Sequence, residues 1–161
     1  MKLKHSLNFN SINNIAKAVK PSQYEPYIDK IFRYAGQYGV QLLPELHGAP
    51  GSQNGEMHSG CVTGPETRGK PEHYFDTDWN KAIAVDTMAK MAAKCAQFPG
   101  TCWGIGVLNE PQPAGNGGSP NNHDLHEFLE SYYDEAILKI RQTLPQDFPV
   151  VLFAWNYDFP R

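Results

Sequence analysis

An amide and a carboxylate stand side by side near the middle of the chain, in the stretch GIGVLNEPQP (residues 104–113). The apolar residues before them predict a short buried strand, and Pro111 stops its regular continuation because proline lacks a backbone donor. Asn109 and Glu110 are therefore expected at the carboxyl end of a strand, where parallel α/β architectures bind their ligands. There Asn109 offers a hydrogen-bond donor and an acceptor, and Glu110 offers a carboxyl group for acid–base chemistry. The alternative for Glu110 is a structural salt bridge.

A second polar stretch, HGAPGSQNG (residues 47–55), follows an apolar run that contains Glu45. Its density of glycine and proline predicts a loop. His47, at the start of this loop, can exchange hydrogen bonds with a ligand without carrying a charge. Asn54 is expected on the same rim as His47. A lone His beside a Gly is more often a structural hydrogen bonder, and it is the presence of both polar stretches that favours a ligand-binding role.

One well-marked helix is predicted ahead of these stretches. It follows Pro21, where Ser22 and Glu25 have the spacing of a capping box, and its apolar residues recur at helical intervals. Gly39 is its natural terminator. Residues 1–20 carry only a weak helical pattern and are treated as a poorly defined segment.

Two further helices are predicted downstream. Asp78 is expected to cap the second helix, which runs to a break at residues 98–100 and has Trp79 packed near its start. The third, at residues 124–144, is the clearest amphipathic helix, because its apolar residues face one way.

Apolar runs predict strands at residues 40–46, 105–108 and 150–154. Together with the helices they give an alternation that is typical of βα units around a parallel sheet. The two long polar loops both follow strands, which favours a (β/α) barrel over a nucleotide-binding sheet. The expected fold class is therefore α/β, with one domain over residues 21–161.

The overall composition excludes several kinds of partner. The formal net charge of -3 and a pI near 6.0 leave no basic footprint for nucleic acid or an anionic membrane. No apolar run approaches the roughly 18 residues of a membrane span, and the start of the chain lacks the apolar centre of a secretory signal. GxGxxG and Walker patterns are missing, so phosphoryl transfer is unsupported.

The cysteines, Cys61, Cys95 and Cys102, do not have the spacing of a metal site, and an odd number cannot pair completely within one chain. A zinc site is therefore not expected. Cys95 and Cys102 are close enough to bridge a short loop, and a buried unpaired pair is the equal alternative. The redox compartment is left open.

LHGAPGSQNG (residues 46–55), followed roughly fifty residues later by GIGVLNEPQP, resembles the exo-β-1,3-glucanase branch of glycoside hydrolase family 5, a family of TIM barrels. Two motifs in the same order make the resemblance specific. It extends from about Tyr27 to Phe159 and implies the third to fifth strands of a (β/α)8 barrel with their helices. The expected fold is thus a partial TIM barrel that is not closed.

The resemblance also implies roles for the polar residues. It makes Glu110 the general acid/base, Asn109 the partner of the sugar's 2-hydroxyl, and His47 the partner of another hydroxyl of the same ring. The chemistry fits these residue types, because a glycosidic oxygen is a poor leaving group that a carboxylic acid can protonate. Asn54, on the same rim, completes the set of polar residues expected to bind substrate.

Aromatic residues are expected to complete the site, because the apolar face of a sugar stacks on an aromatic ring. Trp155 and Tyr157 directly follow the last predicted strand, so they are expected at the same end of the sheet as Glu110. Ordinary packing is the alternative for either ring.

A retaining glycosidase needs a second carboxylate as nucleophile, about 5 Å from the acid. The resemblance places that Glu on the seventh strand, which this chain of 161 residues does not reach. A complete barrel usually takes about 250 residues, so the chain is expected to be the central portion of a longer enzyme or a truncated gene model. Alone it is expected to be inactive.

The predicted function is retaining hydrolysis of β-glucan, most of all β-1,3-glucan attacked from the chain end. No metal or organic cofactor is expected, since two carboxylates suffice. The longer protein is expected to be a secreted monomer acting on cell-wall or storage glucan. Two alternatives stay open: weak glucan binding without catalysis, or an endo-β-1,4-glucanase or mannanase of the same family, because Asn-Glu-Pro is shared among its branches.

Overall fold

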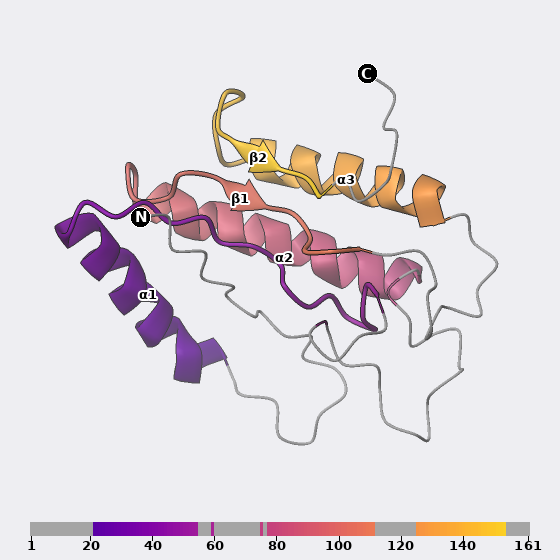
Figure 1. Ribbon diagram of the computed structural model, residues 1–161, viewed down its shortest axis with the longest axis horizontal. Coiled ribbons are helices and arrows are strands. Elements are labelled where there is room, and N and C mark those ends of the chain that lie inside the picture. Colours follow the sequence, from indigo (N-terminus) through magenta and orange to yellow (C-terminus); the bar gives the residue numbers. More distant parts are fainter. Residues whose placement is uncertain (1–20, 55–58, 60–74, 76, 112–124, 154–161) are drawn as a thin grey trace.

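The computed structural model describes residues 21–54, 59, 75, 77–111 and 125–153. Residues 1–20, Cys61, Trp155 and Tyr157 lie outside this part of the chain. Within it the elements follow in the order α1 (Pro21–Gln37), α2 (Asp78–Gln97), β1 (Ile105–Gly106), α3 (Leu125–Arg141) and β2 (Val150–Val151) (Figure 1). All three predicted helices are therefore present, each with bounds close to those expected.

Three extended segments run parallel, with the segment around β1 in the middle. On one side β1 pairs with β2 in parallel register. On the other side residues 40–46 run parallel to it through two isolated bridges, Leu42 with Cys102 and Glu45 with Gly106. The chain order of the segments is therefore also their spatial order.

The extended segments are shorter than the predicted strands. Regular pairing covers two residues in each of β1 and β2. Residues 40–46 make only isolated bridges, because Pro44 interrupts them and has no amide hydrogen to donate. The register is kept nonetheless. The Gly106 amide donates to the Pro44 carbonyl at 2.8 Å, and the Leu46 amide donates to the Gly106 carbonyl at 3.2 Å.

Helices connect the parallel segments and cover them. The connection from residues 40–46 to β1 passes through α2, and the connection from β1 to β2 passes through α3, as parallel pairing requires. α2 and α3 lie side by side along the paired segments (Figure 1). Both helices and the β1 segment contribute to the largest fully buried side chains, with Met88, Met91, Leu129, Tyr132, Ile140, Ile105 and Val107; α1 adds Phe32, and residues 40–46 add Leu46.

α1 begins at Pro21 itself, so Ser22 lies in its first turn and the predicted capping role of Ser22 is wrong. Proline suits a first helical turn, because the N–H that it lacks would be unpaired there in any case. The predicted end of the helix is confirmed. Gly39 has a φ of 66°, and the Val40 amide donates to the Ala35 carbonyl at 2.8 Å, which closes the helix end.

α2 is capped by Thr77, so the prediction that Asp78 is the cap is wrong. The Thr77 backbone is extended, and its side chain accepts a 3.2 Å hydrogen bond from the Asn80 amide. Asp78 is instead the first helical residue, where its charge favours the positive end of the helix dipole. The packing assigned to Trp79 is also wrong, because this side chain is 64% exposed and the buried face of the helix lies elsewhere.

α3 buries the face that its sequence predicts, but it ends at Arg141 and not at residue 144. The Arg141 side chain then serves the turn that leads to β2. Its Nη1 donates to the carbonyls of Pro145 and Phe148, at 2.8 and 2.7 Å. The turn is thereby fastened to the end of the helix that precedes it.

Tyr132 joins α3 to the central segment. Its side chain is fully buried, and its hydroxyl donates a 3.0 Å hydrogen bond to the Val107 carbonyl. The ring of Phe75 packs edge-on against it, with the centroids 5.2 Å apart. Burial, and after it the neighbouring Tyr133, raises the pKa of Tyr132 well above its ordinary value of 10.0. The fold therefore requires the neutral phenol.

This requirement predicts a loss of stability in alkali. The unfolded chain gives up the Tyr132 proton near pH 10, while the folded chain holds it to higher pH. The contribution of neutral Tyr132 to the free energy of unfolding is therefore complete below pH 10. Above pH 10 it is lost, by about 1.4 kcal/mol per pH unit. Tyr132→Phe should flatten this slope and should lower stability at pH 7 by about 1 kcal/mol, because the Val107 carbonyl loses its donor.

Denaturant unfolding at a series of pH values from 7 to 11 checks this expectation. Tyr38→Phe is the matched control, because Tyr38 is 74% exposed and the variant keeps Tyr132. The control should retain the wild-type slope. An equal slope in Tyr132→Phe and in the wild type would show that ionisation of Tyr132 does not limit the stability.

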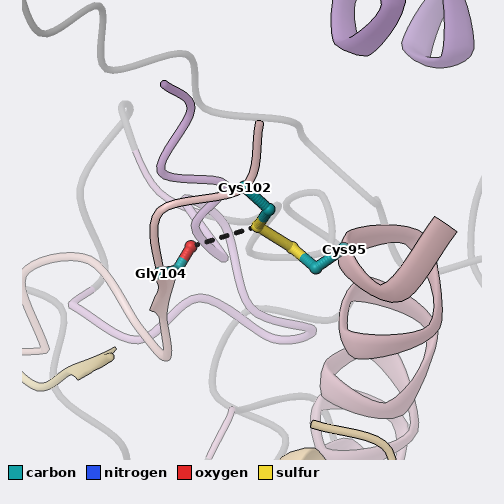
Figure 2. The surroundings of a disulfide bond; sticks show 3 residues. All are labelled: Cys95, Cys102 and Gly104. Carbon is teal, nitrogen blue, oxygen red and sulfur yellow. Dashed lines mark hydrogen bonds between the residues drawn. A yellow bond between two sulfur atoms is a disulfide. The ribbon is translucent and has the colours of Figure 1, made fainter. Parts of the chain in front are cut away.

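The sequence left open whether Cys95 and Cys102 form a disulfide or a buried unpaired pair. In the structure the two cysteines form a disulfide, with their Cα atoms 5.3 Å apart (Figure 2). Both residues are buried. The Cys102 sulfur also lies 3.5 Å from the Gly104 carbonyl oxygen. A disulfide sulfur has no proton to donate, so this approach is a packing contact. The bond fastens the last turn of α2 to the segment that enters β1.

Candidate functional site

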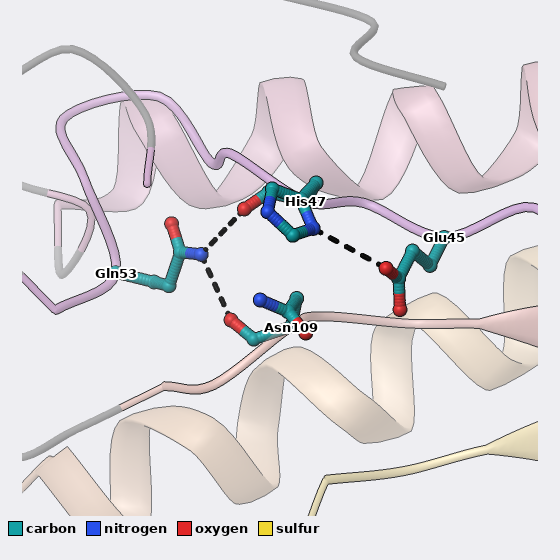
Figure 3. A network of polar contacts seen from close by, with 4 residues as sticks. All are labelled: Glu45, His47, Gln53 and Asn109. Carbon is teal, nitrogen blue, oxygen red and sulfur yellow. Dashed lines mark hydrogen bonds and ion pairs between the residues drawn. The ribbon is translucent and has the colours of Figure 1, made fainter. Parts of the chain in front are cut away.

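The two polar stretches predicted from the sequence meet at the carboxyl ends of neighbouring parallel segments. The backbone N–H of Asn109 donates to the Leu46 carbonyl at 2.9 Å, so the ends of these two segments are hydrogen-bonded side by side. His47 directly follows Leu46, and Glu110 directly follows Asn109. Figure 3 shows the surroundings, with the side chain of Gln53 reaching from the loop toward both segments. Residues about sixty positions apart in sequence are thus neighbours at one rim.

Gln53 is the residue that links the two stretches, and sequence reasoning missed it. Its Nε2 donates to the His47 carbonyl and to the Asn109 carbonyl, each at 2.8 Å, and its Oε1 accepts from the Ala49 amide at 3.0 Å. The residue is 3% exposed. No spacing in the sequence distinguishes it from the other polar residues of the loop. Its importance follows from contacts that only the folded chain makes.

Asn54 continues the same pattern one residue further along. Its Nδ2 donates a 3.0 Å hydrogen bond to the Glu110 carbonyl, and the residue is 8% exposed. Asn54 is therefore brought to the predicted rim. A hydrogen of its amide is directed at the protein backbone, while its predicted contact with substrate stays a prediction.

His47 is held from the other side by Glu45. Its Nδ1 lies 3.2 Å from Glu45 Oε1, with side-chain exposures of 35% for His47 and 15% for Glu45 (Figure 3). The two residues share a face because side chains of an extended segment alternate with a period of two. That period of two was the signal in the sequence that could have paired Glu45 with His47. A carboxylate only accepts, so Nδ1 carries the proton and Nε2 is the nitrogen left for a ligand.

A glycine makes room for the Glu45 side chain. A Cβ atom placed on Gly106 would lie 2.7 Å from the Glu45 Cβ, which is too close for two carbon atoms that are not bonded to each other. The same two residues form the parallel bridge between their segments. Gly106 therefore allows the segment carrying Glu45 and His47 to lie against β1.

Glu110 has a left-handed backbone, with a φ of 43°, directly before the buried Pro111. A residue with a Cβ avoids this region, at a cost of about 1–2 kcal/mol, and proline steers the residue before it toward extended conformations. Residues held in such conformations cluster at functional sites. The strand end is therefore strained at the carboxylate that the sequence singles out.

The predicted stacking residues Trp155 and Tyr157 lie outside the described residues. In the part of the chain that the structure describes, no group of three or more His, Cys, Asp or Glu side chains is arranged to hold a metal ion. Among the same residues, no helix is long and apolar enough to cross a membrane.

No protein-family model matches the chain. Among curated proteins, it is similar to a glucan 1,3-beta-glucosidase of Kluyveromyces lactis, with 36% identity over 89 residues, covering 54% of this chain and 19% of that protein. It is 30% identical over 138 residues to a probable glucan 1,3-beta-glucosidase A of Emericella nidulans, covering 80% of this chain and 30% of that protein. A probable glucan 1,3-beta-glucosidase of Arthroderma benhamiae is 32% identical over 136 residues, with coverages of 80% and 29%.

The chain spans less than a third of the length of these relatives. The three relatives, at 30–36% identity, share the name glucan 1,3-beta-glucosidase. The matches support a glucosidase family for this chain.

Proposed function

We propose that the chain is the central portion of a retaining exo-β-1,3-glucanase of glycoside hydrolase family 5, with Glu110 as general acid/base. The observation that carries the proposal is that His47, Asn109 and Glu110 meet at the ends of parallel segments. There Gln53 donates to the carbonyls of His47 and Asn109, and Asn54 donates to the carbonyl of Glu110. The glucan 1,3-beta-glucosidases to which the chain is similar add support for β-glucan as the substrate.

Glu110 is assigned both proton transfers of the reaction. As an acid it gives its proton to the glycosidic oxygen while the bond to the sugar breaks, and as a carboxylate it then takes a proton from the water that releases the sugar from the nucleophile. Asn109 binds the 2-hydroxyl, and His47 binds a second hydroxyl of the same ring through Nε2. The nucleophile is a carboxylate outside this chain.

The fold that fits this assignment is a part of a TIM barrel, its third to fifth strands with their helices. The parallel order of three segments joined through α2 and α3 supports it. So does the gathering of polar residues at the carboxyl ends of the segments, the face on which such barrels carry their active sites. Trp155 and Tyr157 are proposed to stack on the bound sugar.

We further propose that the full-length protein, meaning this chain together with the segments that supply the nucleophile, is a monomer secreted into an oxidising environment. The disulfide between Cys95 and Cys102 supports this location, because such bonds form and persist outside the reducing cytosol.

The stereochemistry of the first product tests the proposal. The full-length protein should release glucose from the end of a β-1,3-gluco-oligosaccharide, and proton NMR should detect the β-anomer before mutarotation. The chain of 161 residues should release none, because the proposal places the nucleophile outside it. Initial α-glucose would contradict the retaining mechanism. Cleavage inside β-1,4-glucan or mannan would support the endo-acting alternative.

A further inference from the structure

We propose that Gln53 and Asn54 are positioning residues that hold the backbone of Asn109 and Glu110 and so aim the acid/base. This inference rests on the proposed function. We call the two side chains the amide clasp. Gln53 Nε2 donates to the Asn109 carbonyl at 2.8 Å, and Asn54 Nδ2 donates to the Glu110 carbonyl at 3.0 Å. Two neighbouring side chains thus hold two neighbouring carbonyls across a sequence separation of 56 residues.

The side-chain amide of Gln53 makes its hydrogen bonds to backbone groups of the protein. Its two Nε2 hydrogens are given to the carbonyls of His47 and Asn109, and its Oε1 accepts from the Ala49 amide. A primary amide has two donor hydrogens, so Nε2 has none left for a ligand. At 3% exposure Gln53 is also buried away from solvent. Its role is therefore to fix the distance between the backbones that carry His47 and Asn109.

The carbonyls need such partners because the parallel pairing ends here. Among the described residues, the last backbone bond of the ladder on this side runs from the backbone amide of Asn109 to the Leu46 carbonyl, and Pro111 has no amide hydrogen to continue it. Partly buried carbonyls must find donors elsewhere. The clasp supplies these donors from the side chains of a loop. The backbone at Asn109 and Glu110 can therefore depart from the extended conformation.

The conformation that the clasp holds is the strained one. Glu110 has a φ of 43° before a proline, a state that persists only where its surroundings enforce it. The hydrogen bond from Asn54 holds the carbonyl of this same residue. Release of that bond is expected to let Glu110 relax toward an extended φ, which turns its side chain away from its present direction.

A small turn of this kind matters for catalysis, because a displacement of about 1 Å can cost about 10²-fold in rate. The loss should depend on the leaving group. A sugar leaving group needs the proton from Glu110, whereas a dinitrophenolate departs without it. A residue that binds the glucose ring common to both substrates, or one that only stabilises the fold, affects both reactions equally.

Asn54→Asp in the full-length protein tests the clasp, because a carboxylate cannot donate to the Glu110 carbonyl. The value of kcat/KM, which reports the glycosylation step, should fall about 10- to 100-fold for a β-1,3-gluco-oligosaccharide. For dinitrophenyl β-glucoside it should fall less than about threefold. Gln97→Glu makes the same chemical change on an exposed side chain at the far end of α2 and should alter neither value. Equal losses on both substrates would overturn the proposal.

A second variant and a second measurement separate the clasp from the proposed function. Asn54→Ala removes the donor without placing a charge beside a carbonyl, and its crystal structure should show Glu110 with a negative φ. A φ that stays positive would overturn the clasp, whatever the activity. If the wild-type protein cleaves no β-glucan, the proposed function fails, while the φ of Glu110 in Asn54→Ala still decides whether Asn54 holds the backbone.

Discussion

Glu110→Gln in the full-length protein is expected to lower hydrolysis of natural β-1,3-glucan by about 10² to 10⁴-fold, the usual worth of general acid catalysis. Glutamine keeps the size of the side chain and leaves the hydrogen bond from Asn54 to the residue's carbonyl in place. If Glu110 is the proposed acid/base, the variant therefore removes the group that transfers the proton and keeps the backbone contact. Aryl glucosides with good leaving groups should lose much less in the glycosylation step, because they depart without protonation.

Glu45→Gln is the matched control for this experiment. Glu45 is another carboxylate at the same rim, but its Oε1 faces His47 Nδ1, and a glutamine oxygen can still accept from that nitrogen. The control should lose only a small factor, equal for both kinds of substrate. Equal and large losses in Glu110→Gln on glucan and on aryl glucosides would assign Glu110 a structural role or the role of nucleophile.

Gly106→Ala is expected to be the most disruptive small substitution in the sheet. The new Cβ would meet the Glu45 Cβ at 2.7 Å and the Glu45 Cα at 3.5 Å, atoms that no rotation of a side chain can move. Overpacking of this kind typically costs about 1–3 kcal/mol. The segment that carries Glu45 and His47 should shift away from β1, so the melting temperature and any glucan hydrolysis should fall together.

Gly36→Ala provides the comparison, because its new Cβ would also meet an atom at 2.7 Å, in this case the Thr101 hydroxyl oxygen. That oxygen belongs to a side chain that can turn, and alanine in α1 favours the helix by about 1 kcal/mol. Thermal unfolding of both variants measures the difference. A melting temperature of Gly106→Ala within error of the wild type would show that the paired segments slide apart without cost.

The helices were predictable because their evidence is local. The three periodic apolar stretches became α1, α2 and α3, and Gly39 ends α1 as expected because it can take a positive φ. Trp79 was misassigned for a physical reason. α2 is rich in alanine on several faces, so its sequence contrasts weakly between a buried and an exposed side, and neighbouring elements decide which side is covered.

The site was predictable only in part. His47, Asn109 and Glu110 could be predicted as site residues from the order of strand and polar loop, because the carboxyl ends of parallel segments meet at one rim. Gln53 was not predictable, since its importance lies in a contact with the Asn109 carbonyl, which is distant in sequence. The left-handed backbone of Glu110 was equally hidden, because a residue before proline is expected to be extended.

The disulfide between Cys95 and Cys102 encloses an exposed turn in a covalent ring, with Pro99 and Gly100 open to solvent. A protease that cut one peptide bond inside this ring would not divide the molecule. α2 and β1 would stay joined through sulfur, and on a gel the nicked protein would migrate at its intact size until a thiol reductant was added. The integrity of this connection therefore depends on the redox state of its surroundings and not on the continuity of its backbone.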